Sequence, residues 1–125
     1  MKKEFQILLT ALMFYTRLNV ARWVKHDQSN LQNSTKYLPF VGWLVGACAA
    51  LAYLGTIQLL PFHVAVILSL LVSVLITGAF HEDGLADVCD GFGGGWDKVK
   101  IMSIMKDSSI GTYGAIGLII LFSLK

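Results

Sequence analysis

Four carboxylates gather in one short stretch of the chain, from His81 to Gly91. They are half of the eight acidic residues in the sequence, and they follow directly on a long apolar run. If this stretch is helical, Asp83, Asp87 and Asp90 are related by i, i+4 and i+7 and share one face within roughly 60°. Three carboxylates this close repel one another, and a divalent cation removes that penalty. Because Mg²⁺ prefers oxygen ligands and is commonly shared with substrate phosphates, the spacing predicts a Mg²⁺–pyrophosphate site.

Two neighbours of these aspartates belong to the same hypothesis. Glu82 falls about 100° from the shared face, so we expect it at the rim of the site. His81 is either a helix-boundary residue or a group that assists substrate binding and proton transfer. The alternative for the whole stretch is a solvated helix end that carries acidic residues. The spacing is not that of an EF-hand, which needs carboxylates at alternate positions and a closing glutamate.

A second polar segment begins at Lys106. We expect Lys106 to hold a phosphate and Asp107 to complete the metal site. Gly111 lies where the next apolar segment begins, and the amides at a helix N-terminus favour anions. An ordinary helix cap formed by Ser108 or Ser109 explains this segment equally well.

The composition indicates an integral membrane protein. Of the 125 residues, 55% are hydrophobic and only 14% are charged, against roughly 25% charged in a soluble protein. The net charge of +2 and the lack of a basic patch with interleaved aromatics argue against nucleic acid as a partner. Cys48 and Cys89 lie in unlike surroundings, so we expect no disulfide.

The chain's apolar runs predict an all-α, polytopic helical bundle in the membrane. Two uncharged runs, Leu38–Leu60 and Val64–Phe80, are predicted transmembrane helices. The second helix is expected to continue past Phe80 into the acidic stretch. The shorter run Phe5–Tyr15 predicts an interfacial or re-entrant helix, with a signal peptide as the alternative.

The polar connections complete this prediction. Residues 20–36 are expected to form a surface loop or short helix, and Gly93 to Gly95 to break any helix. A short helix is predicted over Lys98 to Met105. A third apolar run begins at Gly111 and is cut off at Lys125. We therefore expect residues 1–125 to be a single membrane domain, the front part of a longer protein.

The basic residues predict the orientation in the membrane. None lies between the two predicted spans, and three lie between the second span and the third apolar run: Lys98, Lys100 and Lys106. Six precede the first span: Lys2, Lys3, Arg17, Arg22, Lys25 and Lys36. Because positive residues gather on the cytoplasmic side, the N-terminus and the acidic stretch are both expected there. Arg22, Lys25 and Lys36 are alternatively candidates to meet a phosphate.

The polar motifs resemble those of a known enzyme family, the adenosylcobinamide-GDP ribazoletransferases, which are the cobalamin synthases of vitamin B12 biosynthesis. The acidic signature is matched by His81-Glu82-Asp83-Gly84-Leu85-Ala86-Asp87 followed by Asp90-Gly91. A second signature is matched by Ile104-Met105-Lys106-Asp107-Ser108 with Gly111-Thr112-Tyr113-Gly114. Phe14–Leu18 and Leu38–Gly42 are similar to the family's N-terminal pattern. Asn19 departs from it, since the family commonly has proline there.

The resemblance implies a phosphoryl-group transfer at the bacterial inner membrane. The ribose 3′-hydroxyl of α-ribazole, or of its 5′-phosphate, attacks the β-phosphorus of adenosylcobinamide-GDP, and GMP leaves. Mg²⁺ is the expected cofactor. Carried over by position, the metal ligands are Asp83, Asp87 and Asp90, with Glu82 as an outer ligand, and the catalytic residues are Asp83, Asp87 and Asp107. The substrate-binding residues are Lys106, which offsets charge on GMP, with His81 and Gly111.

Other classes of membrane protein remain as alternatives. CDP-alcohol phosphotransferases continue their signature with arginine, where this chain has Asp87. Aspartate-rich prenyltransferases also act on pyrophosphates. An ion-handling subunit would favour carboxylates in mid-span, whereas these acids lie at one end of a span. An inactive fragment and an oligomer are both left open.

Overall fold

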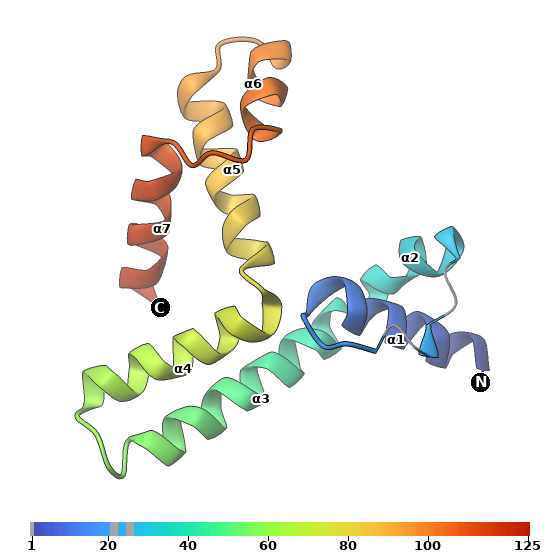
Figure 1. Ribbon diagram of the computed structural model, residues 1–125, viewed down its shortest axis with the longest axis vertical. Coiled ribbons are helices and arrows are strands. Elements are labelled where there is room, and N and C mark those ends of the chain that lie inside the picture. Colours follow the sequence, from blue (N-terminus) through green and yellow to red (C-terminus); the bar gives the residue numbers. More distant parts are fainter. Residues whose placement is uncertain (1, 21–22, 25–26) are drawn as a thin grey trace. The chain divides into compact units, whose positions relative to one another are not determined.

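The computed structural model describes residues 2–20, 23–24 and 27–125, and in this part of the chain helices joined by turns are the regular elements, without strands (Figure 1). The all-α prediction is therefore confirmed for these residues. The chain divides into two compact units, Met1–Ala79 and Phe80–Lys125. Each is described by itself below, and the single membrane domain stays a prediction. Arg22 and Lys25, two candidates for phosphate binding, lie outside the described residues.

The first unit is built on two long helices, α3 (Leu38–Thr56) and α4 (Phe62–Thr77), which pack side by side (Figure 1). The hydroxyl of Ser69 on α4 donates to the carbonyl of Ala49 on α3 over 2.9 Å, which joins the pair. A small core of Ala11, Val41 and Val45 attaches α1 (Lys2–Tyr15) to α3.

A shorter helical segment precedes α3. It consists of α2 (Gln28–Ser34) and the 3-10 helix η2 (Thr35–Tyr37), so of the loop and the short helix left open for this polar region, the structure has the short helix. Lys36 lies 2.5 Å from the Glu4 carboxylate, and the hydroxyl of Tyr37 donates to the same carboxylate over 2.9 Å. In this unit Lys36 therefore pairs with a carboxylate of α1.

The described residues contain one helix that is long and apolar enough to cross a membrane, the continuous run Ser29–Thr56. It includes most of the first predicted span and ends four residues before Leu60. The second predicted span forms α4, which has 16 residues and passes the same criterion only when it is counted with the following helix as a broken pair. The third apolar run is the shorter helix α7 (Thr112–Leu124).

The helix of the second span does not continue into the acidic stretch, so that part of the prediction is wrong. α4 ends at Thr77, and both Gly78 (φ 68°) and Ala79 (φ 61°) adopt left-handed backbone angles. Both of their amides donate to the carbonyl of Val74, which closes the last turn. The Arg17 side chain lies against Gly78, where a β-carbon would come within 2.5 Å of Arg17 Nε. Glycine at this position therefore permits both the left-handed turn and the close approach.

The second unit contains α5 (Phe80–Gly94), α6 (Lys98–Met105) and α7, with α6 and α7 both packed on α5 (Figure 1). The predicted bounds of α6 are confirmed, and the Asp97 carboxylate caps its start by accepting the Lys100 amide over 3.0 Å.

The glycine run breaks the helix later than the sequence predicts. α5 continues through Gly93 and Gly94 and ends only before Gly95. The ring of Tyr113 occupies the space that a side chain at Gly93 would need. The glycines therefore let neighbouring segments approach α5 closely, and this packing offsets their low helix propensity.

Candidate active site

The three predicted metal-binding aspartates lie on one uninterrupted helix, α5, as their spacing predicts. Their surroundings differ, because α7 covers only part of the helix. Asp83 is exposed, Asp87 is half-buried and Asp90 is buried. Neither Asp83 nor Asp87 makes a side-chain hydrogen bond with another described residue, so their oxygen atoms remain available to a ligand.

Asp90 connects the two polar signatures. Its Oδ2 accepts the amide of Gly111 over 2.7 Å, and its Oδ1 accepts the amide of Gly114 over 2.8 Å. These amides belong to the first turn of α7, where the helix itself supplies no acceptor. The anion expected at this helix N-terminus is therefore present, and it is a carboxylate of the protein itself. A phosphate could take the amide of Gly111 only by displacing Asp90.

The two glycines at the start of α7 are required by this contact. A β-carbon at Gly111 would overlap Asp90 Oδ1 and lie 2.9 Å from Asp90 Cγ. One at Gly114 would overlap Asp90 Oδ2 and lie 3.0 Å from the carbonyl oxygen of Ala86. The glycine spacing of the second signature therefore matches the carboxylate of the first.

Glu82 is buried, whereas the sequence places it at the exposed rim of the site. It shares the α7-facing side of α5 with Ala86 and Asp90, at intervals of four residues, and is 8% exposed. Its Oε1 lies 3.4 Å from Lys125 Nζ, and within the described part of the chain Oε2 has no hydrogen-bond partner. The reason for the difference is the packing of α7, which the helical period alone does not reveal. The role of Glu82 as an outer metal ligand stays a prediction.

Asp107 lies in the exposed loop between α6 and α7. Its Oδ1 accepts the amide of Ser109 over 3.1 Å. Hydrogen bonds from the side chain and then the backbone of Ser109 lower the pKa of Asp107 below its ordinary value. A carboxylate with a lowered pKa is held in its ionised form, which suits a metal ligand better than a general base.

A cavity of about 310 Å³ joins the two signatures, since both Asp90 and Asp107 line it. Its other walls come from the end of α5, from α6, from the loop that leads into α7 and from the first turn of α7: Gly94, Ile104, Ser109, Ile110, Gly111, Thr112 and Tyr113. We take this cavity as the candidate site because acidic residues of both signatures line it. Asp83 and Asp87 are not among its lining residues.

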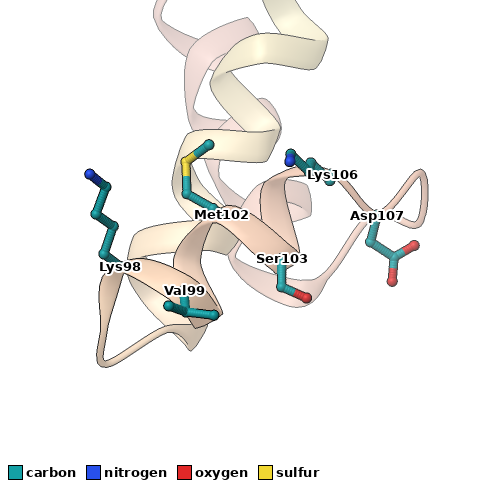
Figure 2. A pocket seen from close by; sticks show the side chains of 6 residues that line it. All are labelled: Lys98, Val99, Met102, Ser103, Lys106 and Asp107. Atoms are coloured by element: carbon teal, nitrogen blue, oxygen red, sulfur yellow. The ribbon is translucent and has the colours of Figure 1, made fainter.

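A larger and more open hollow of about 670 Å³ lies over α6, and Figure 2 shows the side chains that line it. Lys98 and Lys106 contribute its basic groups, and Val99 and Met102 its apolar surface. The charged ends of Lys98 and Asp107 point away from each other there (Figure 2). Lys106 is exposed, and His81 is exposed with its ring 5.4 Å from that of Phe80 in an edge-to-face contact.

Among the described residues, no three side chains of histidine, cysteine, aspartate or glutamate are arranged to hold a metal ion. The oxygen donors of Asp83, Asp87 and Asp107 are nevertheless of the type that Mg²⁺ prefers. The metal, catalytic and substrate roles assigned from the sequence therefore stay predictions.

Comparison with known proteins supplies the family. A family profile described as cobalamin-5-phosphate synthase matches residues 7–125. The chain belongs to this family. It is 47% identical over all 125 residues to the adenosylcobinamide-GDP ribazoletransferase of Leptospira interrogans, and 46% identical over 123 residues to that of Shewanella sp. (strain W3-18-1). The family resemblance of the sequence motifs is confirmed.

The chain spans about half the length of these curated relatives: the match covers 47% of each of them, and 100% and 98% of this chain, respectively. No solved structure matches.

Proposed function

We propose that this chain forms the N-terminal part of a transferase that joins adenosylcobinamide-GDP to α-ribazole, or to α-ribazole 5′-phosphate, with release of GMP. The observation that carries the proposal is the contact of Asp90 with Gly111 and Gly114, which brings the family's two signatures to one cavity. The names of the relatives support the substrate class.

The reaction replaces one bond to phosphorus by another. A bond forms between the ribose 3′-oxygen and the β-phosphorus, and the bond from that phosphorus to the bridging oxygen of GMP breaks. Such transfers depend on positioning and on neutralising charge more than on covalent chemistry by the protein. The hydroxyl proton passes to Asp107 or, through water, to solvent. The lowered pKa of Asp107 makes it a weaker base than an ordinary aspartate.

The carboxylates would supply the ligands of a divalent cation. We propose that Asp83, Asp87 and Asp107 hold Mg²⁺, which when bound would neutralise the pyrophosphate of the substrate. Lys106, exposed beside Asp107, would offset the charge on the departing GMP. His81 is proposed as a further substrate contact at the start of α5.

The family and the candidate helix Ser29–Thr56 indicate a membrane protein. We propose the bacterial inner membrane, with the N-terminus and α5 on the cytoplasmic side. The distribution of lysine and arginine supports this orientation, because Lys98, Lys100 and Lys106 follow the second apolar run and none lies in the turn before it.

The test measures GMP release from adenosylcobinamide-GDP and α-ribazole by membranes that carry the chain, with and without Mg²⁺. One preparation holds the 125-residue chain, and a second holds the chain extended by the C-terminal half of the Leptospira relative. Asp87→Asn is expected to lower release by about 100-fold or more, since it removes a proposed ligand. Asp97→Asn is the matched control, because asparagine caps a helix as well as aspartate does.

Each outcome bears on the proposal. Release that depends on Mg²⁺ and on Asp87 would support it. Activity in the extended chain alone would show that the shorter one is an inactive fragment. No release from either preparation would overturn the proposal and favour another transferase that acts on a pyrophosphate.

A further inference from the structure

The buried carboxylate of Asp90 lines the cavity, but it is also hydrogen-bonded to the backbone of α7. Both of its oxygens accept amides of α7, over 2.7 and 2.8 Å, and its residue is 8% exposed. Asp83 and Asp87, by contrast, make no such bonds with the described residues and are more exposed. Three aspartates that look equivalent in the sequence therefore have two different surroundings.

We propose that Asp90 is a positioning residue: it fixes the start of α7 on α5 and thereby places Asp107 at the cavity. This inference rests on the proposed function, because Asp107 matters there as a metal ligand. Asp90 then supports the site without being a metal ligand itself.

The connection from Asp90 to Asp107 is short and restrained at both ends. The amide of Asp107 donates to the carbonyl of Ile104 over 3.0 Å, which ties the loop to the end of α6. The Asp107 carboxylate accepts the Ser109 amide, which folds the next two residues into a tight turn. Gly111, two residues later, is held by Asp90. Loss of the Asp90 contact would free the far end of this loop and leave Asp107 without a fixed place.

A double-mutant cycle on metal affinity tests the inference without any use of the transferase reaction. Mn²⁺ is the probe, and its binding to the chain in detergent is read from its EPR signal. Asp90→Asn and Asp107→Asn are each expected to weaken Mn²⁺ binding by about tenfold or more, as losses of supporting or direct ligands do. The double variant is expected to bind no more weakly than Asp107→Asn alone, because Asp90 acts through Asp107.

Two results would overturn the inference. If the double variant loses Mn²⁺ affinity by the product of the two single losses, Asp90 is an independent ligand. If Asp90→Asn binds Mn²⁺ as tightly as the unchanged chain, Asp90 does not contribute to the metal site. Asp97→Asn is the control and should bind Mn²⁺ as the unchanged chain does. If Mn²⁺ binding follows the expected cycle and no variant or parent releases GMP, the proposed reaction fails while the positioning role stands.

The labelling rates of the two cysteines test whether α7 has moved away from α5. Cys89 on α5 lies against Gly117 of α7, where a β-carbon would come 2.7 Å from its sulfur, and Cys48 lies on α3 in the other unit. In Asp90→Asn, a maleimide is expected to label Cys89 about tenfold faster, because one amide loses its acceptor, and Cys48 at an unchanged rate. Unchanged labelling of Cys89 would contradict the docking role.

If both cysteines of Asp90→Asn react faster, the substitution unfolds the chain. Gly111→Ala then replaces it in the cycle. This variant keeps every carboxylate and acts on the Asp90 contact, since the three atoms nearest to the added β-carbon all belong to Asp90. Additive effects with Asp107→Asn in that cycle would equally overturn the inference.

Discussion

The amide of Gly114 donates to the carboxylate of Asp90 over 2.8 Å, and the two residues are 24 positions apart in the sequence. Both are buried where α7 begins beside α5. A charged acceptor at the first turn of a helix satisfies amides that the helix leaves unpaired, and it interacts favourably with the helix dipole. The contact therefore stabilises the second unit as well as joining the two signatures.

Gly114→Ala is expected to destabilise the chain by about 2 kcal/mol, because overpacking of a close contact costs about 1–3 kcal/mol. The added β-carbon would overlap Asp90 Oδ2 and crowd the carbonyl oxygen of Ala86. Thermal unfolding in detergent, followed by circular dichroism, measures the change. Gly55→Ala on α3 is the matched control, since its β-carbon would meet nothing within 4 Å. Equal unfolding temperatures for the two variants would contradict this account.

Two neighbouring substitutions at the end of α4 are expected to act in opposite directions. Gly78→Ala places a β-carbon against the Arg17 side chain in a left-handed backbone (φ 68°), so we expect a loss of about 2 kcal/mol. Ala79→Gly relieves a left-handed alanine (φ 61°), so we expect a gain of about 1 kcal/mol. The same unfolding measurement compares them, and a loss of stability in Ala79→Gly would refute the left-handed turn.

Local pattern was enough to predict most of the helices. The aspartate spacing predicts one helical face on α5, and the residues between the glycine run and Lys106 predict α6 with its bounds. Both are properties of consecutive residues. The break at Gly78 was missed because the apolar run continues through it, and a single glycine within such a run is compatible with an unbroken helix.

Contacts between distant residues could not be predicted from the spacing. Asp90 has the same type and the same helical face as Asp83 and Asp87, and only the docking of α7 distinguishes it. Glu82 is buried for the same reason. The glycines in the second signature were a usable signal, because two glycines at a helix start indicate close approach of another group.

The pH dependence of the reaction should not involve Asp107. Hydrogen bonds from Ser109 lower its pKa below the ordinary value of 3.8, so the carboxylate stays ionised until the pH falls through that lowered pKa. Any stability that these bonds contribute is present above the ordinary pKa and is lost only below it. Asp107→Asn should therefore lower GMP release without changing the shape of the pH–rate profile from about pH 5 to about pH 8. The disappearance of one limb of that profile would instead identify Asp107 as a general base.

The predicted orientation can be tested with single cysteines in a chain that lacks Cys48 and Cys89. Leu59 lies in the turn between α3 and α4 and is 85% exposed, whereas Lys98 lies at the exposed start of α6. Because positive residues stay on the cytoplasmic side, an impermeant maleimide added to intact spheroplasts should label Leu59→Cys and leave Lys98→Cys unlabelled. Permeabilised cells provide the control, in which both positions should react. Labelling of Lys98→Cys in intact cells would place α6 outside, and the acidic helix could not then meet a cytoplasmic nucleotide substrate.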